Sequence, residues 1–333
     1  MLKTLRFQII SIDFNKVFTS ALLMSTIGLS LVHAENESET SNIQRGPGYA
    51  NSSWVTSHGD SSNSDYSPVH TPTDQQFDWQ LLQGSAPWVA PSVAKDGTLY
   101  ISSGRGKGFS SLHAINPDGT IKWESAPYRG PADLDTLALF SCPVIDDAGD
   151  IYIGDANQLW AFTPNGTVKW QTDLKQQGIN GVFVTAIIVG DYVGGASTDG
   201  KLALFHRSSG NLAMPVLDLP GLETNIDSEL PPGLWSGGFI DKQRIQMVWD
   251  MLIGNVYEVT KSPAVHPNTG RIYVSAAGKQ PDIGYLYGID VVEDKLSISF
   301  QTEVPANSGT SPTISPDGKR VYAMANGELF ALD

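Results

Sequence analysis

Cysteine, charge and long apolar runs are all scarce in this sequence. Cys142 is the only cysteine among 333 residues, so no internal disulfide bond can form and stability must come from packing. Charged residues make up 17% of the chain, below the roughly 25% of an ordinary domain. Asp and Glu (35) outnumber Lys and Arg (21), the net charge is −14, and no basic cluster occurs. Such a surface repels a phosphate backbone, so we expect no nucleic-acid partner.

The motifs of several enzyme classes are missing too. The six histidines show no H-x-x-x-H or Cys/His spacing, so we predict no metal site. No G-x-S-x-G nucleophile elbow occurs. Residues 104–108 are rich in glycine and basic side chains, but they lie between two expected strands, whereas a phosphate-binding loop is followed by a helix. We therefore expect a flexible loop tip at this position.

The N-terminal region has the pattern of a secretory signal peptide. Basic residues precede an apolar run over 17–32, which is too short for a comfortable membrane span and ends at Val32-His33-Ala34. We predict a signal peptide over 1–34 with cleavage after Ala34; the alternative is a retained N-terminal anchor. The residue directly after the cleavage site is Glu35 and not cysteine, so a lipid anchor of the bacterial lipoprotein kind is not expected. We expect the mature protein to be periplasmic or secreted, without a membrane span.

Residues 35–76 form a polar lead-in to the rest of the chain. Ser, Asn, Gly and Asp dominate this segment, so little apolar surface is available to order it, and we expect its first part to be mobile. Trp54, Tyr66 and Pro68 are exceptions. Large aromatic side chains in a polar stretch predict that this part is held against the folded body.

From residue 77 onward the chain repeats itself. The two clearest copies cover 90–123 and 142–170, and each contains a small apolar strand, a turn with Gly, a strand with Tyr, a third strand, an Asp-Gly or Asn-Gly turn and a strand that ends on Trp. Weaker copies cover 191–210, 262–300 and 311–332. The tyrosines at equivalent positions are Tyr100, Tyr152, Tyr192, Tyr273 and Tyr322.

This repeat predicts an all-β propeller over 77–333. Asp-Gly and Asn-Gly turns between strands indicate hairpins, so each copy is a four-stranded antiparallel blade, and repeats of 40–50 residues with four strands are typical of propellers. We expect five or six blades. The last copy lacks its Trp-bearing strand, and we expect residues 77–82 to supply it and close the ring; alternatively, further blades follow. Three tryptophans are predicted to dock blade on blade: Trp79, Trp123 and Trp170.

The repeat resembles that of the pyrroloquinoline-quinone-like (PQQ-like) propellers. The shared run is Pro-x-(Val/Ile), Asp-Gly-x-(Leu/Ile/Val)-Tyr, Leu-x-Ala-(Ile/Phe/Leu) and Gly-Thr-(Ile/Val)-Lys-Trp. That family includes the quinoprotein alcohol dehydrogenases and the non-enzymatic propeller lipoprotein of the outer-membrane-barrel assembly machinery. Residues 54–68 are also similar to the stretch before the first blade of quinoprotein dehydrogenases, where its role is structural. The resemblance implies a fold and leaves the function open.

The resemblance to quinoprotein dehydrogenases implies a quinone over a Trp platform, a calcium ion held by Glu, Asn and Asp, a catalytic Asp and often a disulfide between adjacent cysteines. Cys142 is alone, so that disulfide cannot exist, and no calcium ligands stand at matching positions. Calcium needs about six to eight oxygen ligands, and no single segment supplies them. We predict no cofactor and no metal; PQQ and calcium belong to the alternative function below.

Long loops indicate a working surface. In a propeller the loops between strands two and three emerge on the same face as the blade linkers, and these are the long loops here, whereas the opposite hairpins are tight. Binding residues concentrate on long loops carried by a rigid scaffold. The candidate contact residues for a ligand or partner on this face are Arg105, Lys107, Asp133, Asp135, Trp235 and Lys279.

Three functions follow from these patterns. The favoured one is an exported, non-catalytic, monomeric propeller that binds an envelope protein or a small-molecule ligand through the long-loop face. The second is a PQQ-dependent dehydrogenase that oxidises an alcohol or a sugar. The third is a secreted hydrolase or lyase on a propeller scaffold, which needs side chains that converge for acid–base chemistry.

Overall fold

The computed structural model describes residues 45–67, 78–222, 257–278, 283–305, 310–325 and 327–333, with isolated positions at 242, 245, 246, 249, 250 and 280. The chain divides into two compact units, Met1–Glu39 and Thr40–Asp333, and all described residues belong to the second. The predicted signal peptide, Trp235 and Lys279 lie outside the described residues. Within the described ranges, no helix is long and apolar enough to cross a membrane.

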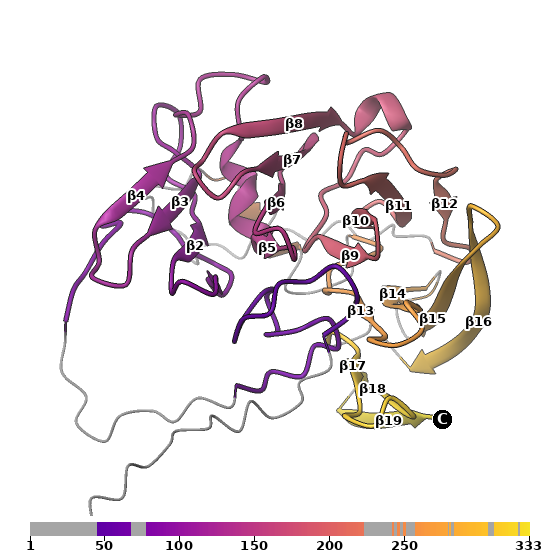
Figure 1. The fold of residues 1–333 in the computed structure, drawn as a ribbon. Helices are drawn as coiled ribbons and strands as arrows, with labels where there is room; N and C mark the ends of the chain where they lie inside the picture. The colour runs from indigo at the N-terminus through magenta and orange to yellow at the C-terminus, as the bar shows by residue number, and fades with distance from the viewer. Residues whose placement is uncertain are drawn as a thin grey trace, which may run out of the picture. The chain divides into compact units, whose positions relative to one another are not determined.

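Five antiparallel sheets follow one another along the chain, and in each the strands pair in chain order (Figure 1). The first sheet contains β1 (Ser92–Val93), β2 (Leu99–Ser102), β3 (Leu112–Ile115) and β4 (Ile121–Glu124). The second contains β5 (Val144–Ile145), β6 (Ile151–Gly154), β7 (Gln158–Phe162) and β8 (Val168–Asp173). The third contains β9 (Ile187–Val189), β10 (Tyr192–Ala196), β11 (Lys201–His206) and β12 (Leu217–Asp218). Two 3₁₀ helices, η1 (Thr136–Phe140) and η2 (Lys175–Gln177), lie in the links between these sheets.

The fourth and fifth sheets complete the series. The fourth contains β13 (Ala264–Val265), β14 (Ile272–Ala277), β15 (Ile283–Val292) and β16 (Lys295–Pro305). The fifth has three strands, β17 (Thr313–Ile314), β18 (Val321–Ala325) and β19 (Glu328–Leu332). The five tyrosines of the repeat all lie on the second strand of their sheet. The predicted all-β architecture of antiparallel blades is therefore confirmed.

Tight turns join the strands because glycine supplies the left-handed backbone that they need. Gly119 and Gly166 have φ values of 82° and 86°, a region that other residues rarely adopt. A Cβ atom on Gly119 would lie 2.5 Å from the ring of Trp79, and one on Gly166 would lie 2.7 Å from the ring of Trp123. Each glycine thus serves both its own turn and a tryptophan that packs on that turn.

Successive sheets pack face to face through their inner strands. Every residue of β3, β5, β6 and β7 is buried, whereas the outer strands β4 and β8 are largely exposed. The ring of Trp123 stacks on that of Phe162 in the next sheet, with centroids 6.0 Å apart. Strands that are covered on both faces read as nearly continuous apolar runs, which explains sequences such as Leu159-Trp160-Ala161-Phe162.

Residues 45–67 run past the first strand of every sheet. This segment lies among the labels β5, β9, β13 and β17 in Figure 1. Its backbone hydrogen bonds to the first strands, or to the residue just after one, include Val93 N–H to Trp54 O, Ala50 N–H to Ile145 O, Ile145 N–H to Val55 O, Gly190 N–H to Pro47 O, Val265 N–H to Ser61 O and Ile314 N–H to Ser62 O. The polar composition of the lead-in predicted that its first part is mobile, whereas its large aromatic residues predicted that a part of it is held against the folded body. The structure holds residues 45–67 against the sheets through backbone hydrogen bonds.

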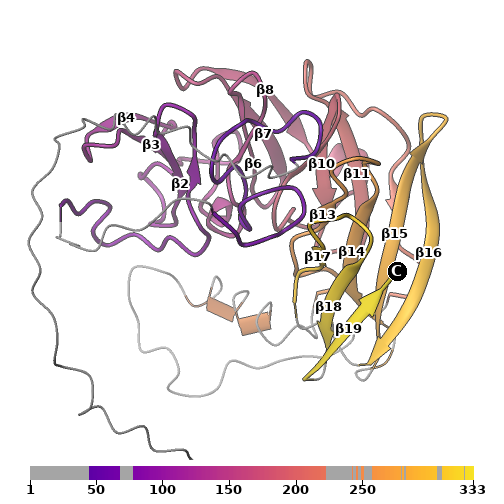
Figure 2. The same ribbon diagram turned by 60° about the horizontal axis from the view of Figure 1, so that its bottom comes forward.

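The strand predicted to close the ring is not seen in the described residues. Residues 78–82 form no strand, and no other part of the chain that the structure describes pairs with the outer side of β19. The Trp79 indole N–H nevertheless donates to the carbonyl of Pro117 in the first sheet, at 3.2 Å, as the Trp123 indole does to Pro164 of the second sheet. Leu82 then adopts a φ of 58°, and its carbonyl accepts the N–H of Ser85, so the extended backbone ends there. Figure 2 shows β19 beside β18 at the end of the series.

Candidate functional site

The structure brings together two of the predicted contact loops. Residues 103–110 join β2 to β3, and residues 125–135 follow β4. The Gly108 N–H donates to the Tyr128 carbonyl at 2.7 Å, and the Tyr128 N–H donates to the Phe109 carbonyl at 2.9 Å. These bonds place a strand 2–3 loop against a sheet linker, as the propeller geometry predicts.

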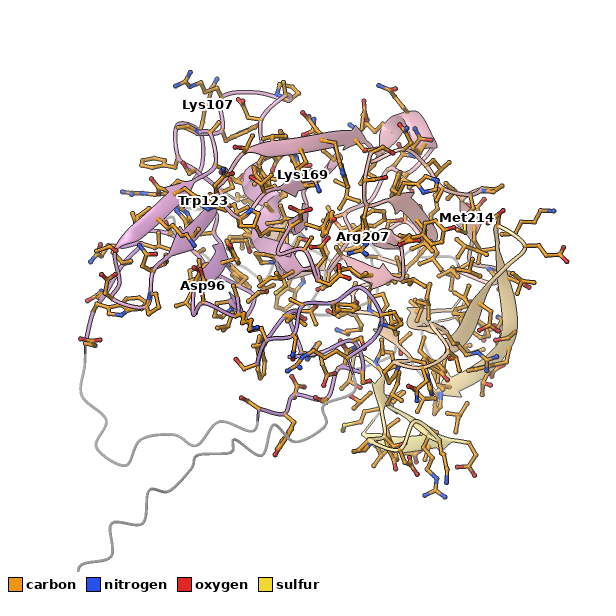
Figure 3. The ribbon with its side chains drawn as sticks, viewed as in Figure 1. Asp96, Lys107, Trp123, Lys169, Arg207 and Met214 are labelled. Carbon is orange, nitrogen blue, oxygen red and sulfur yellow. The ribbon has the colours of Figure 1, made fainter. Side chains whose placement is uncertain are left out.

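The side chains of these loops differ in what they do. Arg105 and Lys107 are exposed; the Arg105 guanidinium lies 4.1 Å from the centre of the Phe109 ring, and Lys107 is labelled in Figure 3. Asp133 accepts the backbone N–H groups of Arg129 and Gly130 at 2.9 and 3.2 Å. Asp135 is the N-cap of η1 and accepts the Leu137 N–H at 2.5 Å. The two carboxylates therefore hold the loop, and contact with a partner at this surface stays a prediction.

Asp155 is a buried acid that the sequence analysis did not single out. It is 1% exposed, and it accepts the N–H groups of Asp135, Asn157 and Gln158 and the indole N–H of Trp160. Burial raises its pKa to about 6, against the effect of these donors. Its partners are all in its own sheet and linker, so Asp155 fixes the linker and is not part of a cleft.

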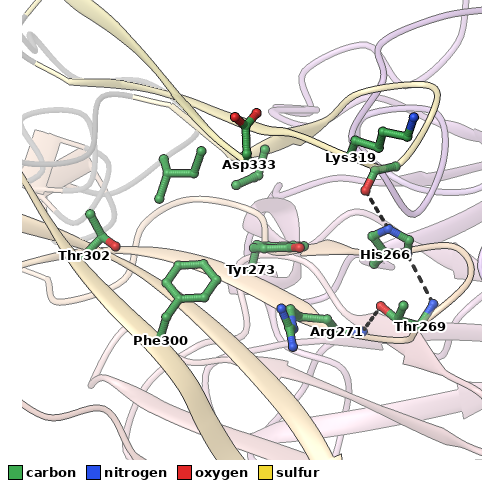
Figure 4. A pocket seen from close by; sticks show the side chains of 11 residues that line it. His266, Thr269, Arg271, Tyr273, Phe300, Thr302, Lys319 and Asp333 are labelled. Atoms are coloured by element: carbon green, nitrogen blue, oxygen red, sulfur yellow. Dashed lines mark hydrogen bonds between the residues drawn. The ribbon is translucent and has the colours of Figure 1, made fainter.

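A hollow of about 490 Å³ lies between the fourth and fifth sheets (Figure 4). Its walls come from the β13–β14 turn, β14 and β16 on one side, and from the β17–β18 turn, β18 and the end of β19 on the other. The lining residues are His266, Thr269, Arg271, Tyr273, Phe300, Thr302, Gly318, Lys319, Val321, Leu332 and Asp333. None of the four described contact residues, Arg105, Lys107, Asp133 and Asp135, lines this hollow.

Hydrogen bonds fix the polar side of this hollow. His266 Nδ1 accepts the N–H groups of Asn268 and Thr269, so Nε2 carries the proton and donates to the Gly318 carbonyl at 2.9 Å. Arg271 binds Asp290 through two bonds of 2.8 Å. The hydrogen bond to Asp290 raises the pKa of Arg271, so this cation persists at any ordinary pH.

An aromatic residue in this hollow takes the place that tryptophan has in the first two sheets. The Phe300 ring lies 6.1 Å from that of Tyr273, and the corresponding distances are 5.8 Å for Trp123 with Tyr100 and for Trp170 with Tyr152. The indole N–H groups of Trp123 and Trp170 donate to turn carbonyls of the next sheet, those of Pro164 and Arg207. Phenylalanine has no such donor, and its ring faces the hollow instead.

The end of β19 lines this hollow through Leu332 and Asp333. In the antiparallel pair of β18 and β19, Ala325 lies opposite Glu328 across a two-residue turn, and Tyr322 lies opposite Ala331 further along. A pair that closes a two-residue turn exchanges hydrogen bonds, and the pattern then alternates. The backbone N–H groups of Leu329 and Ala331 therefore point away from β18, toward a side where the described residues place no strand.

The described residues do not fit a quinone and its metal ion. Among them, no three His, Cys, Asp or Glu side chains converge to hold a metal. The polar groups along the segment 45–67 are used within the protein: Asn63 donates to the carbonyls of Ser262 and Pro312, and Asp60 accepts the N–H of Ser62. We derive no reaction step through a quinone.

Comparisons with known proteins support the fold. No family model and no curated protein sequence matches the chain. The structure of a europium-containing methanol dehydrogenase aligns with this chain at 16% sequence identity and a TM-score of 0.51. The alignment covers 87% of this chain and 59% of the dehydrogenase. BamB from Moraxella catarrhalis has 12% identity, a TM-score of 0.45 and coverage of 73% and 60%. The quinohemoprotein alcohol dehydrogenase of Comamonas testosteroni has 16% identity, a TM-score of 0.46 and coverage of 72% and 50%.

These similarities bear on architecture alone. The chain spans 50% to 60% of the length of the proteins that it matches. At 16% identity, the similarity to the methanol dehydrogenase shows a shared fold and not a shared activity. The predicted PQQ-like propeller fold is confirmed.

Proposed function

We propose that this PQQ-like propeller chain is an exported binding protein that receives an extended segment of a partner protein along the outer edge of β19. The observation that carries the proposal is the fifth sheet itself. Four sheets have a fourth strand, whereas among the described residues the fifth has three. An edge strand with unpaired N–H and C=O groups is a template for strand addition.

The side chains of β19 support this proposal. Natural edge strands are commonly protected by lysine, proline or bulges, and none of these occurs in Glu328-Leu329-Phe330-Ala331-Leu332. Leu329 is 67% exposed. The strand is thus largely apolar, without a bulge, and unpaired on one side among the described residues, which suits main-chain pairing with an incoming segment.

The hollow next to Phe300 supports a preference of this binding site for a particular sequence in the partner segment. In the first two sheets the turn before the fourth strand, Pro117–Gly119 or Pro164–Gly166, lies against a tryptophan of the preceding sheet or segment. Phe300 offers the fifth sheet the equivalent aromatic surface, next to about 490 Å³ of space. The partner segment that fits is a Pro-x-Gly turn followed by a strand, as in residues 116–124 of this chain.

A synthetic peptide with the sequence of residues 116–124 is the probe for this proposal. We expect saturable binding to the mature protein, measured by calorimetry. Ala331→Pro removes an outward N–H that β18 does not use, so the variant should fold and bind at least about tenfold more weakly, which is about 1.4 kcal/mol. Ala331→Val keeps the N–H and is the matched control. Equal affinity of the Pro and Val variants, or no binding by the wild type, would contradict the proposal.

Export is a part of this proposal that the N-terminal sequence supports. Sequencing of the protein recovered from the cell envelope or the medium should give Glu35 as the first residue, because the small residue Ala34 fits the cleavage site. Recovery of the chain in the cytosol with residues 1–34 attached would contradict export and leave strand binding to be judged by the peptide experiment.

A further inference from the structure

Three side chains that are distant in the sequence form a hydrogen-bonded series at the start of the last sheet. Asp65 Oδ1 and Oδ2 lie 2.9 and 3.1 Å from His58 Nδ1. His58 Nε2 lies 3.1 Å from the hydroxyl of Ser311, which is 253 positions further along the chain. A carboxylate, an imidazole and a hydroxyl are therefore connected in that order.

The carboxylate sets the direction of these bonds. An ionised Asp65 can only accept, so His58 Nδ1 carries the proton and Nε2 is left to accept the hydroxyl proton of Ser311. The Ser262 N–H donates to the Ser311 oxygen at 3.1 Å and fixes its position. This is the arrangement in which an imidazole can take a proton from a nucleophilic hydroxyl.

The backbone that presents Asp65 is unusual. Asn63 and Asp65 both have positive φ values, 54° and 51°, although neither is glycine. The side-chain amide of Asn63 holds this bend by donating to the carbonyls of Ser262 and Pro312. The bend also lets the Asp65 N–H donate to the His58 carbonyl, so the same two residues meet through both backbone and side chain. Backbone strain of this kind is frequent at functional sites.

A second hollow gives access to the series. It has a volume of about 290 Å³ and is lined by His58, Asp65, Thr310, Ser311, Thr313, Tyr322, Ala323, Met324 and Leu329. His58 and Ser311 are both partly exposed. The Thr310 hydroxyl accepts the Met324 N–H at 3.1 Å, which leaves its own proton to be donated into the hollow. Met324 and Leu329 are 45% and 67% exposed and supply an apolar wall.

The chain contains an internal comparison for this arrangement. Glu124, His113 and Ser103 are connected in the same order, at 2.8 Å from Glu124 to Nδ1 and 2.9 Å from Nε2 to the Ser103 hydroxyl. Ser103 is 0% exposed and His113 is 4% exposed, so no substrate can reach them. Connectivity alone does not make a reactive serine; the hollow at Ser311 makes the difference.

We propose that Ser311 and His58 form an acyl-transfer site that hydrolyses small carboxylic esters, with Asp65 as the residue that positions His58. The Ser311 oxygen attacks the ester carbonyl while its proton passes to His58 Nε2, which returns the proton to the departing alcohol. Water then attacks the acyl-serine, loses a proton to His58, and releases the carboxylic acid as the proton returns to Ser311. The Thr310 hydroxyl, which lines the same hollow, is the donor that we assign to the oxyanion. The activity does not depend on strand binding at β19.

The test is active-site labelling of the mature protein with a fluorophosphonate. Mass spectrometry should find the label on the peptide that carries Ser311 and not on the one that carries Ser103. Hydrolysis of p-nitrophenyl acetate should be lost in Ser311→Ala and reduced roughly 10²–10⁴-fold in His58→Gln, and Ser103→Ala should match the wild type. Equal labelling of both serines, no labelling of Ser311, or hydrolysis that survives Ser311→Ala would overturn the proposal.

Two further variants separate chemistry from structure. Asp65→Asn should lower kcat and leave KM unchanged, because His58 Nδ1 loses the acceptor that fixes its tautomer; an unchanged kcat would overturn the positioning role. Ser311→Cys keeps the shape of the side chain if Ser311→Ala fails to fold. The introduced thiol should react with iodoacetamide faster than the buried Cys142, whose pKa is raised to about 12 by burial. An introduced thiol as inert as that of Cys142 would count against the site.

Discussion

The indole N–H of Trp123 donates a hydrogen bond of 2.9 Å to the backbone carbonyl of Pro164. The bond joins the last strand of the first sheet to the turn between the third and fourth strands of the second. Trp79 reaches Pro117, and Trp170 reaches Arg207, in the same way. The first three sheets are thus fastened by one repeated contact between an aromatic donor and a turn carbonyl.

Trp170→Ala should destabilise the protein strongly. The side chain is 8% exposed, packs on Tyr152 and donates to the Arg207 carbonyl, so its truncation removes a buried ring and leaves a cavity. We expect a loss of about 3–5 kcal/mol in the free energy of unfolding, measured by urea denaturation. Trp88→Ala is the control, since Trp88 is 44% exposed and should cost about 1 kcal/mol or less. Equal losses at the two positions would refute the docking role of Trp170.

Arg207→Met should be costly because it leaves a buried charge without its partner. Arg207, labelled in Figure 3, lies 2.9 Å from Asp146, which is 3% exposed and also accepts the hydroxyl of Tyr152 at 2.8 Å. Burial raises the pKa of Asp146, and Arg207 opposes this shift. Removing one partner of such a pair costs about 3–5 kcal/mol.

A double-variant cycle checks this prediction. Asp146→Asn combined with Arg207→Met should recover at least about 1 kcal/mol relative to the sum of the single changes, because neither side chain is then charged. Strict additivity in urea denaturation would show that the pair is not coupled.

The stability of the protein should depend on pH through His113. Burial is the main influence on this side chain and holds its pKa below the usual value, against the effect of Glu124. The unfolded chain therefore takes up a proton before the folded chain does, so stability from this group is complete above about pH 6.5 and declines as the pH falls. His113→Gln should flatten this part of the curve. Identical pH profiles for the variant and the wild type would be incompatible with the shift.

The four described residues of the predicted contact surface should separate into two classes. Asp135→Ala removes the N-cap of η1 and should cost about 1 kcal/mol. Lys107→Ala changes an exposed side chain and should stay within about 0.5 kcal/mol of the wild type. Thermal denaturation of both variants and the wild type under the same conditions measures these two stability changes. A reversed order would mean that Lys107, and not Asp135, stabilises the loop.

Local features of the fold were predictable from the sequence. The equivalent tyrosines fall on β2, β6, β10, β14 and β18, and the Asp-Gly and Asn-Gly turns lie between strands where they were expected. The alternation of side chains along a strand and the residue types of tight turns depend on only a few neighbouring residues, so both can be recognised in the sequence. The fold class followed because the same unit recurs with a constant set of strands.

The candidate sites were not predictable in this way. His58 and Ser311 are separated by 253 positions, and nothing near either residue indicates the other. The hollow at Phe300 arises because a phenylalanine stands where two earlier sheets have tryptophan, and it becomes visible only when the fifth sheet is placed beside the fourth. The aromatic residues of the lead-in predicted that it is held against the folded body, but not that residues 45–67 bind the first strand of every sheet.

Strands, turns and the order in which strands pair could be read from the amino-acid sequence, because they depend on residues a few positions apart. The missing fourth strand of the last copy was also visible in the sequence, whereas the places of the two hollows and the meeting of a hydroxyl with an imidazole emerged only from the folded chain. Those features come from the packing of segments that are distant along the chain, and no short-range pattern records how such segments meet.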